Sequence, residues 1–310
     1  MTKKKGSLIY LLAAVSAAFI WGFLTIPLKR LHEIGYPSEQ ILYYRVFASF
    51  ILIWIFNLPF RRKVIKADID LLRTMPAPDR KKALLLLLAT GIFITANWFT
   101  YIYVVNHIGV KVAGFGYLIC PLITAGGGFL ILKEPLSRVK VIGITTAVIS
   151  IIILSTGSVS QALWSVLVAI SYSIYLIIQR VLTQFDKINM LALQLIIAML
   201  LLLPFYIYQF KSFPTGAEFW LTIFIVALLF TLVPLLLSLF ALTGIPSSTL
   251  GITIYINPVI TFGVAFFYFH ESFEQSQLAG YLLLLASVII FNWQIISNIA
   301  SRKKLRTQLS

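Results

Sequence analysis

The sequence predicts an all-α membrane protein of ten transmembrane helices, built as two five-helix repeats of inverted topology with both termini in the cytoplasm. Three observations support this expectation. Of the 310 residues, 60% are hydrophobic and only 11% are charged; the apolar residues fall into ten long runs; and part of the sequence recurs after 137 residues. Soluble domains are closer to half apolar and a quarter charged, so lipid rather than water must surround most of these helices.

The ten apolar runs are each about 18–24 residues long, which suits a helix that crosses a hydrocarbon core about 30 Å thick. Most of the connections between them are short, so that consecutive helices are expected to be antiparallel. The runs are 7–28, 40–58, 83–105, 112–132, 139–156, 162–180, 190–210, 219–242, 249–269 and 277–297.

The first run follows three lysines, Lys3 to Lys5, and therefore resembles a signal sequence. It continues to Leu28 without a clear small-residue cleavage site, which favours a retained first span. The one long connection, 59–82, carries eight lysines and arginines. We expect this loop to determine topology and to attract anionic lipid.

The basic residues are distributed unevenly between the two sides of the predicted bundle. With the N-terminus in the cytoplasm, 20 lysines and arginines lie on the cytoplasmic side and only four outside: Lys29, Arg30, Lys111 and Lys211. This bias follows the positive-inside rule, so the net charge of +15 indicates orientation rather than nucleic-acid binding. We expect a multi-pass protein of the inner (plasma) membrane whose partners include the lipid bilayer and no nucleic acid.

An internal repeat appears when the sequence is shifted by 137 residues. Matches of distinctive residue types then align without a gap: Gly114 with Gly251, Pro121 with Pro258, Thr124 with Thr261, Gly126 with Gly263, Glu134 with Glu271, and Gly143 with Gly280. The repeat divides the chain into units 1–156 and 157–310. Because each unit has five spans, an odd number, the second enters the membrane from the opposite face, as in inverted-repeat transporters.

The matched prolines Pro121 and Pro258 occupy equivalent positions in the two units. Pro234, in the eighth run, is a third candidate for a hinge. A proline leaves a carbonyl four residues earlier without its usual donor and can kink the helix. Paired kinks at mirrored positions favour hinges for alternating access.

Catalytic and metal-binding groups are missing from the interior of the predicted spans. All ten acidic residues lie outside or at the edges of the runs, the histidines His32, His107 and His270 lie in or beside loops, and Cys120 is the single cysteine. We therefore expect no catalytic residue, no metal site and no cofactor. The lack of a carboxylate or histidine relay favours facilitated diffusion or exchange over proton coupling, while sodium bound by backbone carbonyls stays open.

Two alternatives to a transporter deserve comparison. A lipid-modifying membrane enzyme would require a catalytic dyad within the spans, and the sequence shows none. A channel or scaffold has no need of inverted, proline-marked hinges.

Arg45 is the charge that lies deepest in a predicted span, about six residues into the second run. A charge at that depth must be satisfied by a partner. One interpretation is that Arg45 reaches the headgroups or binds backbone carbonyls. The other is that it forms a counter-charge or gate for an anionic or zwitterionic ligand.

Asn97 lies in the middle of the third run and shares a helix face with Tyr101, four residues later. A buried amide at this depth has two plausible uses: a hydrogen bond to a ligand, or a hydrogen bond that joins the third helix to a neighbour.

These residues also carry a family resemblance. The chain resembles the RarD branch of the drug/metabolite transporter superfamily, with its EamA repeats, over about residues 7–297. The matching motifs are Ala96-Asn97-Trp98, Val105-Asn106-His107, Gly116-Tyr117, Pro121-Leu122, Glu134, Arg45-Val46 and Tyr255-Ile256-Asn257-Pro258. The resemblance implies export or exchange of small metabolites, amino acids or drugs through a cavity lined by helices 1, 3, 4, 6, 8 and 9.

We therefore expect a secondary transporter, a monomer or weak dimer, that moves a small molecule by alternating access. Aromatic walls with few polar anchors suit an amphipathic substrate. Besides Arg45, Asn97 and Tyr101, the expected substrate-binding residues are Trp21, Trp98, Tyr117, Tyr172, Tyr175, Ser238 and Tyr255.

Overall fold

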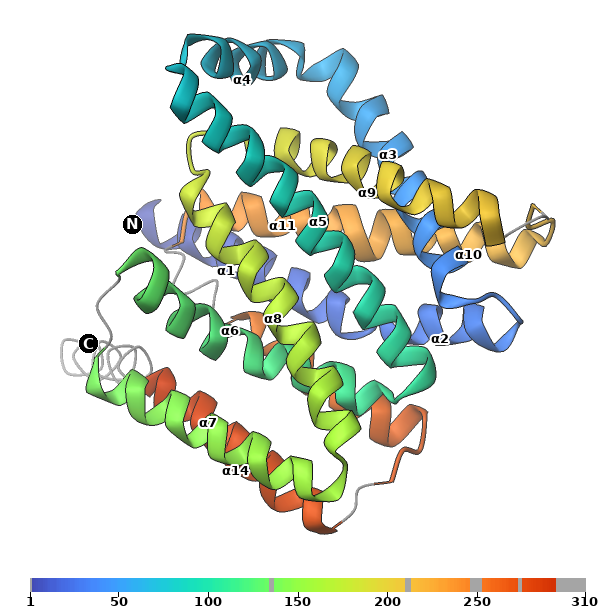
Figure 1. The fold of residues 1–310 in the computed structure, drawn as a ribbon, viewed down its shortest axis with the longest axis vertical. Coiled ribbons are helices and arrows are strands. Elements are labelled where there is room, and N and C mark those ends of the chain that lie inside the picture. Colours follow the sequence, from blue (N-terminus) through green and yellow to red (C-terminus); the bar gives the residue numbers. More distant parts are fainter. Residues whose placement is uncertain (1, 134–136, 210–212, 246–252, 273–274, 294–310) are drawn as a thin grey trace.

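The computed structural model describes residues 2–133, 137–209, 213–245, 253–272 and 275–293, and within these ranges every regular element is a helix. Figure 1 shows the helices packed into one bundle. The elements are α1 (Thr2–Gly22), α2 (Thr25–Glu33), α3 (Ser38–Phe60), α4 (Arg62–Thr74), α5 (Ala77–His107), α6 (Val110–Leu132), α7 (Arg138–Gly157), α8 (Val159–Val181), α9 (Lys187–Gln209), α10 (Ala217–Ala227), η1 (Leu228–Leu232), α11 (Val233–Leu242), α13 (Ile256–Gly263), η2 (Val264–Tyr268) and α14 (Gln275–Phe291).

Eight described helical segments are long and apolar enough to cross a membrane, and they coincide with the first eight predicted runs. They are Leu8–Glu33, Ser38–Phe60, Ala77–His107, Val110–Ile131, Arg138–Ser155, Val159–Val181, Lys187–Gln209 and Ala217–Ala241. The described parts of the ninth and tenth runs form shorter apolar helices, Ile256–Tyr268 and Leu278–Phe291. The all-helical membrane architecture is thus confirmed, with eight of the ten expected segments at full spanning length.

The first span is longer than the predicted run 7–28. The chain breaks the helix only briefly, where Phe23 N donates to Ile20 O (3.1 Å), and then continues as α2. Lys29 and Arg30 therefore lie on a helix rather than in a loop. The extension forms because Leu28 and Leu31 are fully buried, whereas Arg30 stays exposed.

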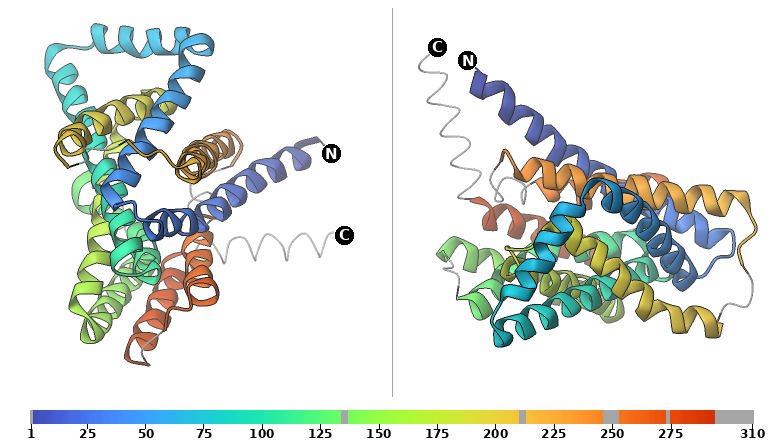
Figure 2. Two further views of the ribbon diagram at one scale, coloured as in Figure 1. Left: turned by 90° about the vertical axis from the view of Figure 1, so that its right-hand side faces the viewer. Right: turned by 90° about the horizontal axis from the view of Figure 1, so that it is seen from above.

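The basic segment 59–82, expected as a loop, contains the amphipathic helix α4. Leu71 and Leu72 pack on a cluster that includes Leu182 and Phe185. Figure 2 shows α4, in light blue, crossing between the ends of α3 and α5. The helix is absent from a hydropathy profile because its charged residues hide a narrow apolar stripe.

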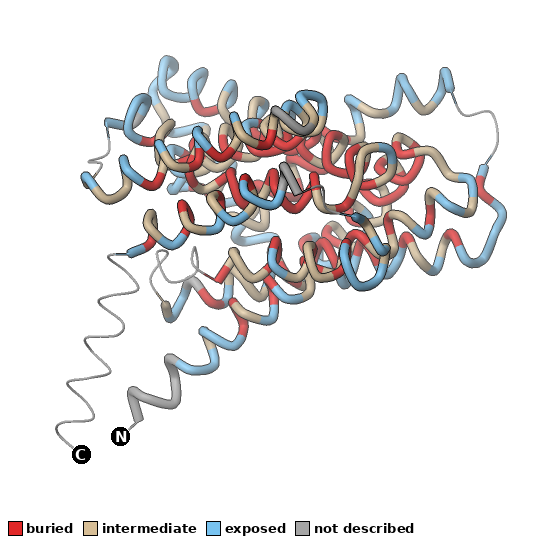
Figure 3. The backbone as a smooth tube through the Cα atoms, turned by 90° about the horizontal axis from the view of Figure 1, so that it is seen from below, coloured by how far each residue is buried: buried red, intermediate tan, exposed pale blue. Residues whose placement is uncertain are grey.

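Buried residues concentrate along the middle of the bundle, as Figure 3 shows. Many large apolar side chains, in contrast, are exposed. Leu130, for example, is 76% exposed and Ile207 is 69% exposed. This inverted distribution is stable only where lipid covers the outside.

The helices α7 and α14 form a close antiparallel pair, visible side by side in Figure 1. A Cβ atom on Gly143 would lie 2.8 Å from Phe291 Cβ, and one on Gly280 would lie 2.6 Å from Leu154 Cγ. The two contacts are interchanged by the 137-residue shift, because Gly143 corresponds to Gly280 and Leu154 to Phe291. The pair therefore has the reciprocal contacts of a two-fold interface.

Candidate functional site

Arg45 lies seven residues after Ser38, the first residue of α3, which is about 10 Å along the helix. Its side chain is buried within the bundle, and the residue is 4% exposed. The Nε atom donates a hydrogen bond to Thr231 Oγ1 (3.1 Å), and the guanidinium carbon lies 5.5 Å from the centre of the Trp98 ring. Arg45 thus turns toward other helices, and the interpretation that it reaches the headgroups does not describe this structure.

Thr231 belongs to η1, a π-helical turn between α10 and α11. Its hydroxyl donates to Val226 O (3.0 Å), five residues earlier, and accepts from Arg45. Wider turns of this kind occur frequently at functional sites. The sequence prediction missed Thr231, although a polar residue three positions before Pro234 in an otherwise apolar run was an available signal.

Aromatic side chains surround the Arg45 guanidinium. Tyr101 and Tyr117 lie close enough to interact with its charge, and their rings are 5.2 Å apart. Tyr101 also contacts Thr261 of α13. The structure therefore brings together residues of α3, α5, α6, η1 and α13, among them the predicted substrate-binding residues Arg45, Tyr101 and Tyr117.

Asn97 is fully buried, and its amide is satisfied by protein groups. Its Nδ2 donates to Val168 O (3.0 Å), and its Oδ1 accepts from the Tyr117 hydroxyl (3.2 Å). These bonds join α5 to α6 and α8. Asn97 therefore positions Tyr117 beside Arg45 and does not present a free amide in this conformation.

Two further tyrosines of the predicted set extend the aromatic wall along α8. The Tyr117 and Tyr172 rings are 5.5 Å apart, and the Tyr172 and Tyr175 rings are 5.6 Å apart. Tyr172 and Tyr255 both pack against the core cluster formed by α6, α7, α8 and α14.

Trp21 and Ser238 differ in their distance from the π turn. Trp21 Nε1 donates to Phe230 O (3.0 Å), the residue before Thr231. Ser238 is on α11, seven residues after Thr231, or about 10 Å along the helix. Trp21 thus contacts the wall of the candidate site, whereas Ser238 lies two turns away.

The three predicted hinge prolines lie within helices. Pro121 is inside α6, Pro258 inside α13 and Pro234 near the start of α11. Their role as hinges stays a prediction.

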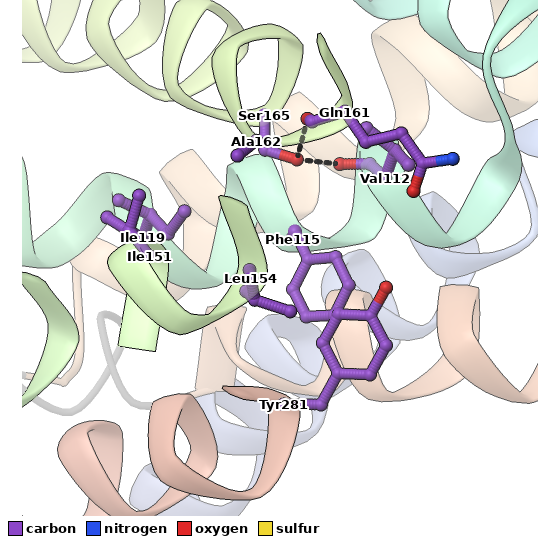
Figure 4. A pocket seen from close by; sticks show the side chains of 9 residues that line it. All are labelled: Val112, Phe115, Ile119, Ile151, Leu154, Gln161, Ala162, Ser165 and Tyr281. Carbon is purple, nitrogen blue, oxygen red and sulfur yellow. Dashed lines mark hydrogen bonds between the residues drawn. The ribbon is translucent and has the colours of Figure 1, made fainter. Parts of the chain in front are cut away.

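A small pocket of about 10 Å³ lies between α6, α7, α8 and α14. Figure 4 shows Ser165 bonded to Val112 O (3.0 Å) and Gln161 O (3.1 Å) on one side of it, with Phe115 and Tyr281 on another. The volume suffices for about one water molecule. This cavity is too small for a metabolite, so Arg45 and its aromatic neighbours form the stronger candidate site.

Contacts between the two repeats occur at both ends of α3. Near its start, the Glu271 carboxylate accepts from Val110 N (2.6 Å) and Lys111 N (3.0 Å) at the first turn of α6. Lys29 Nζ lies 3.9 Å from the same carboxylate. The carboxylate thus caps the first turn of α6; its repeat mate Glu134 lies outside the described residues.

At the other end of α3, Arg61 forms an ion pair with Asp186 (2.7 Å), in the connection between α8 and α9. Asp68 of α4 accepts from Asn189 Nδ2 (2.7 Å). The described residues hold no group of three or more metal-ligating side chains.

Comparison with known proteins decides the family. The model of the EamA-like transporter family matches residues 8–156 and again 159–293. This chain belongs to the EamA-like transporter family. The two matches give it two EamA-like repeats, and its relatives place it among the RarD-like members. It is therefore a membrane transporter, and a multi-pass protein of the inner membrane.

Three curated relatives of this EamA-like transporter cover almost the whole chain. The uncharacterized transporter YojE of Bacillus subtilis (strain 168) is 30% identical over 277 residues, 88% of this chain and 90% of the relative. Protein RarD of Streptomyces exfoliatus is 28% identical, covering 96% and 92%. Protein RarD of Escherichia coli (strain K12) is 25% identical, covering 90% and 92%.

A protein of known crystal structure shares the fold of this EamA-like transporter. The superposition has a TM-score of 0.60 at 16% sequence identity and covers 92% of this chain and 97% of the other. At that identity the likeness concerns the fold alone.

Proposed function

We propose that this protein is a secondary transporter that moves a small metabolite, amino acid or amphipathic drug across the inner membrane by alternating access, as an exporter or exchanger. The observation that carries the proposal is the position of Arg45. It is buried in one repeat and hydrogen-bonded to Thr231 of the other. A polar contact between the halves, deep in an apolar bundle, is where such transporters bind substrate.

The proposed architecture is a pair of inverted five-helix units, 1–156 and 157–310, with both termini in the cytoplasm and with the ninth and tenth runs as full spans of the second unit. The reciprocal contacts of Gly143 with Phe291 and Gly280 with Leu154 support this arrangement. Equivalent residues of two units contact each other mutually only when a two-fold axis relates them.

Alternating access requires that the two ends of the site open in turn. We assign these gates to the contacts between repeats at the two ends of α3: Glu271 with the start of α6, and Arg61 with Asp186. The prolines Pro121 and Pro258 would let α6 and α13 bend as one gate opens. In the present conformation both contacts are formed and Arg45 is enclosed.

The substrate would lie against Arg45, Trp98, Tyr101 and Tyr117, with Tyr172 and Tyr175 extending the wall and Trp21 and Tyr255 bordering it. The protein would act as a monomer or weak dimer, because a complete site is formed within one chain.

The function is tested by a thermal-shift screen of the purified protein with amino acids, choline-like cations, nucleosides and chloramphenicol, followed by exchange of each stabilising solute in liposomes. The proposal expects at least one solute both to stabilise the protein and to exchange. If no solute of these classes exchanges while the same preparation turns over lipid, the result would contradict the transport function and favour a membrane enzyme.

A further inference from the structure

The unusual feature of the site is the electrostatic state of Arg45. The residue is 4% exposed, and its Nη1 atom has no hydrogen-bond partner among the described residues. A guanidinium has five N–H donors in a planar fork, two of them on Nη1. The Nε donor is bonded to the Thr231 hydroxyl, whereas the two donors of Nη1 are unused. The side chain therefore presents unused donors inside the bundle.

Among the described residues, the charge of Arg45 also has no carboxylate counterion. The described acidic residues lie at the ends of helices or in connections, and the ion pairs among them are made by Lys29, Arg30 and Arg61. The Trp98 face and the neighbouring tyrosines compensate the charge only in part. Removal of a cation from water without a full partner is strongly unfavourable.

We infer that the substrate carries a carboxylate and that Arg45 binds it, with the apolar part of the substrate lying on Trp98 and Tyr101. A carboxylate supplies both missing elements at once, a negative charge and a planar pair of acceptors that matches the guanidinium fork. This inference rests on the proposed transport function and names the substrate class for the same site.

The surroundings of Arg45 limit the charge of that substrate to one negative group at the site. The other basic residues of the described spans lie within a few residues of a span end, as Lys29 and Lys111 do. A doubly charged phosphate would therefore retain an uncompensated charge in an apolar bundle. The rings of Trp98, Tyr101 and Tyr117 suit an aromatic or otherwise apolar body.

The experiment compares solutes that differ only in the charged group. Liposomes that contain the full-length protein are loaded with phenylacetate or phenylacetamide, and in a second series with indole-3-acetate or indole-3-acetamide. Phenyl phosphate tests the doubly charged case. We expect each carboxylate to exchange at least about tenfold better than its amide, the equivalent of one lost hydrogen bond to a charged group.

Variants then assign the preference to Arg45. R45M should reduce carboxylate exchange to the level of the amide, and R45K should retain part of the preference because it keeps the charge but loses the fork. The matched control is R73M, which removes an exposed arginine of α4 and should behave as the unaltered protein.

The outcomes separate the two proposals. Equal exchange of carboxylates and amides by the unaltered protein would overturn the carboxylate inference and leave the transport function standing. A preference that survives in R45M would also overturn it. If no solute of any class exchanges, the transport function itself fails. The paired solutes decide the matter on the unaltered protein even if R45M does not fold.

Discussion

The indole Nε1 of Trp21 donates a hydrogen bond to the carbonyl oxygen of Phe230 (3.0 Å), four residues before Pro234. In an α-helix the N–H of residue 234 would bond to the carbonyl of residue 230, but proline has no N–H. A side chain of α1 thus replaces a backbone donor of α11. The bond holds α1 against the turn that presents Thr231 to Arg45.

Replacement of Trp21 by Phe should destabilise the protein by about 1–3 kcal/mol, because the Phe230 carbonyl is left unpaired in an apolar interior. In the double variant with Pro234→Ala, residue 234 regains an N–H that can bond to Phe230. The combined loss of stability should therefore be smaller than the sum of the two single losses. Chemical unfolding in detergent measures the four proteins; strict additivity would show that the two residues do not share this carbonyl.

The matched glycines of the two repeats give a second test. Gly143→Ala and Gly280→Ala should each lower stability by about 1–3 kcal/mol, because the new methyl group would overlap Phe291 or Leu154. The controls Gly126→Ala and Gly263→Ala, also repeat mates, add a methyl group to open space and should be neutral or slightly stabilising. A different response within either matched pair would argue against two-fold equivalence.

Glu271→Gln tests the contact between Glu271 and the first turn of α6. The variant keeps the shape but removes the charge that interacts with the helix N-terminus and Lys29, so we expect a loss of about 1–2 kcal/mol. We also expect faster labelling of a cysteine placed at Ile108, in a Cys120→Ala background, as this gate opens more often. The control is Glu218→Gln, which breaks an exposed ion pair with Arg30 and should change little.

If labelling at position 108 is unchanged in Glu271→Gln while stability falls, Glu271 is a structural anchor and not a gate.

Thr231→Val removes the acceptor of Arg45 at nearly constant volume. We expect a loss of about 1.5–3 kcal/mol, since a hydrogen bond to a buried charged group disappears, together with a slower transport rate. Thr222→Val, in the same span outside the π turn, is the matched control and should retain both properties. Normal stability in Thr231→Val would show that Arg45 finds an equivalent partner elsewhere.

The spanning helices were predictable because long apolar runs are a strong signal that depends on composition alone. The same reasoning failed at α4, where charged residues conceal a short amphipathic helix, and at α2, where Lys29 and Arg30 suggested a loop. Local charge was misleading at α2 because Leu28 and Leu31 anchor the helix from its other face.

The candidate site was predictable only in part. Arg45 and Trp98 were recognisable as a charge at depth and an aromatic residue beside a polar one, and the structure brings them together. Thr231 and the π turn were not recognisable, because a hydropathy profile does not show where a helix widens into a π turn. Asn97 had two plausible roles, and only the positions of Val168 and Tyr117 show that its amide is satisfied within the protein.

The central claim is tested most directly by trans-stimulated exchange in liposomes. Radiolabelled solute is added outside, with or without the same unlabelled solute inside, for the unaltered protein, R45M and R73M. Alternating access at Arg45 predicts that internal solute accelerates uptake by the unaltered protein and by R73M, and that R45M loses this acceleration. Uptake that is indifferent to internal solute, as through a channel, or equal stimulation in R45M, would contradict the account.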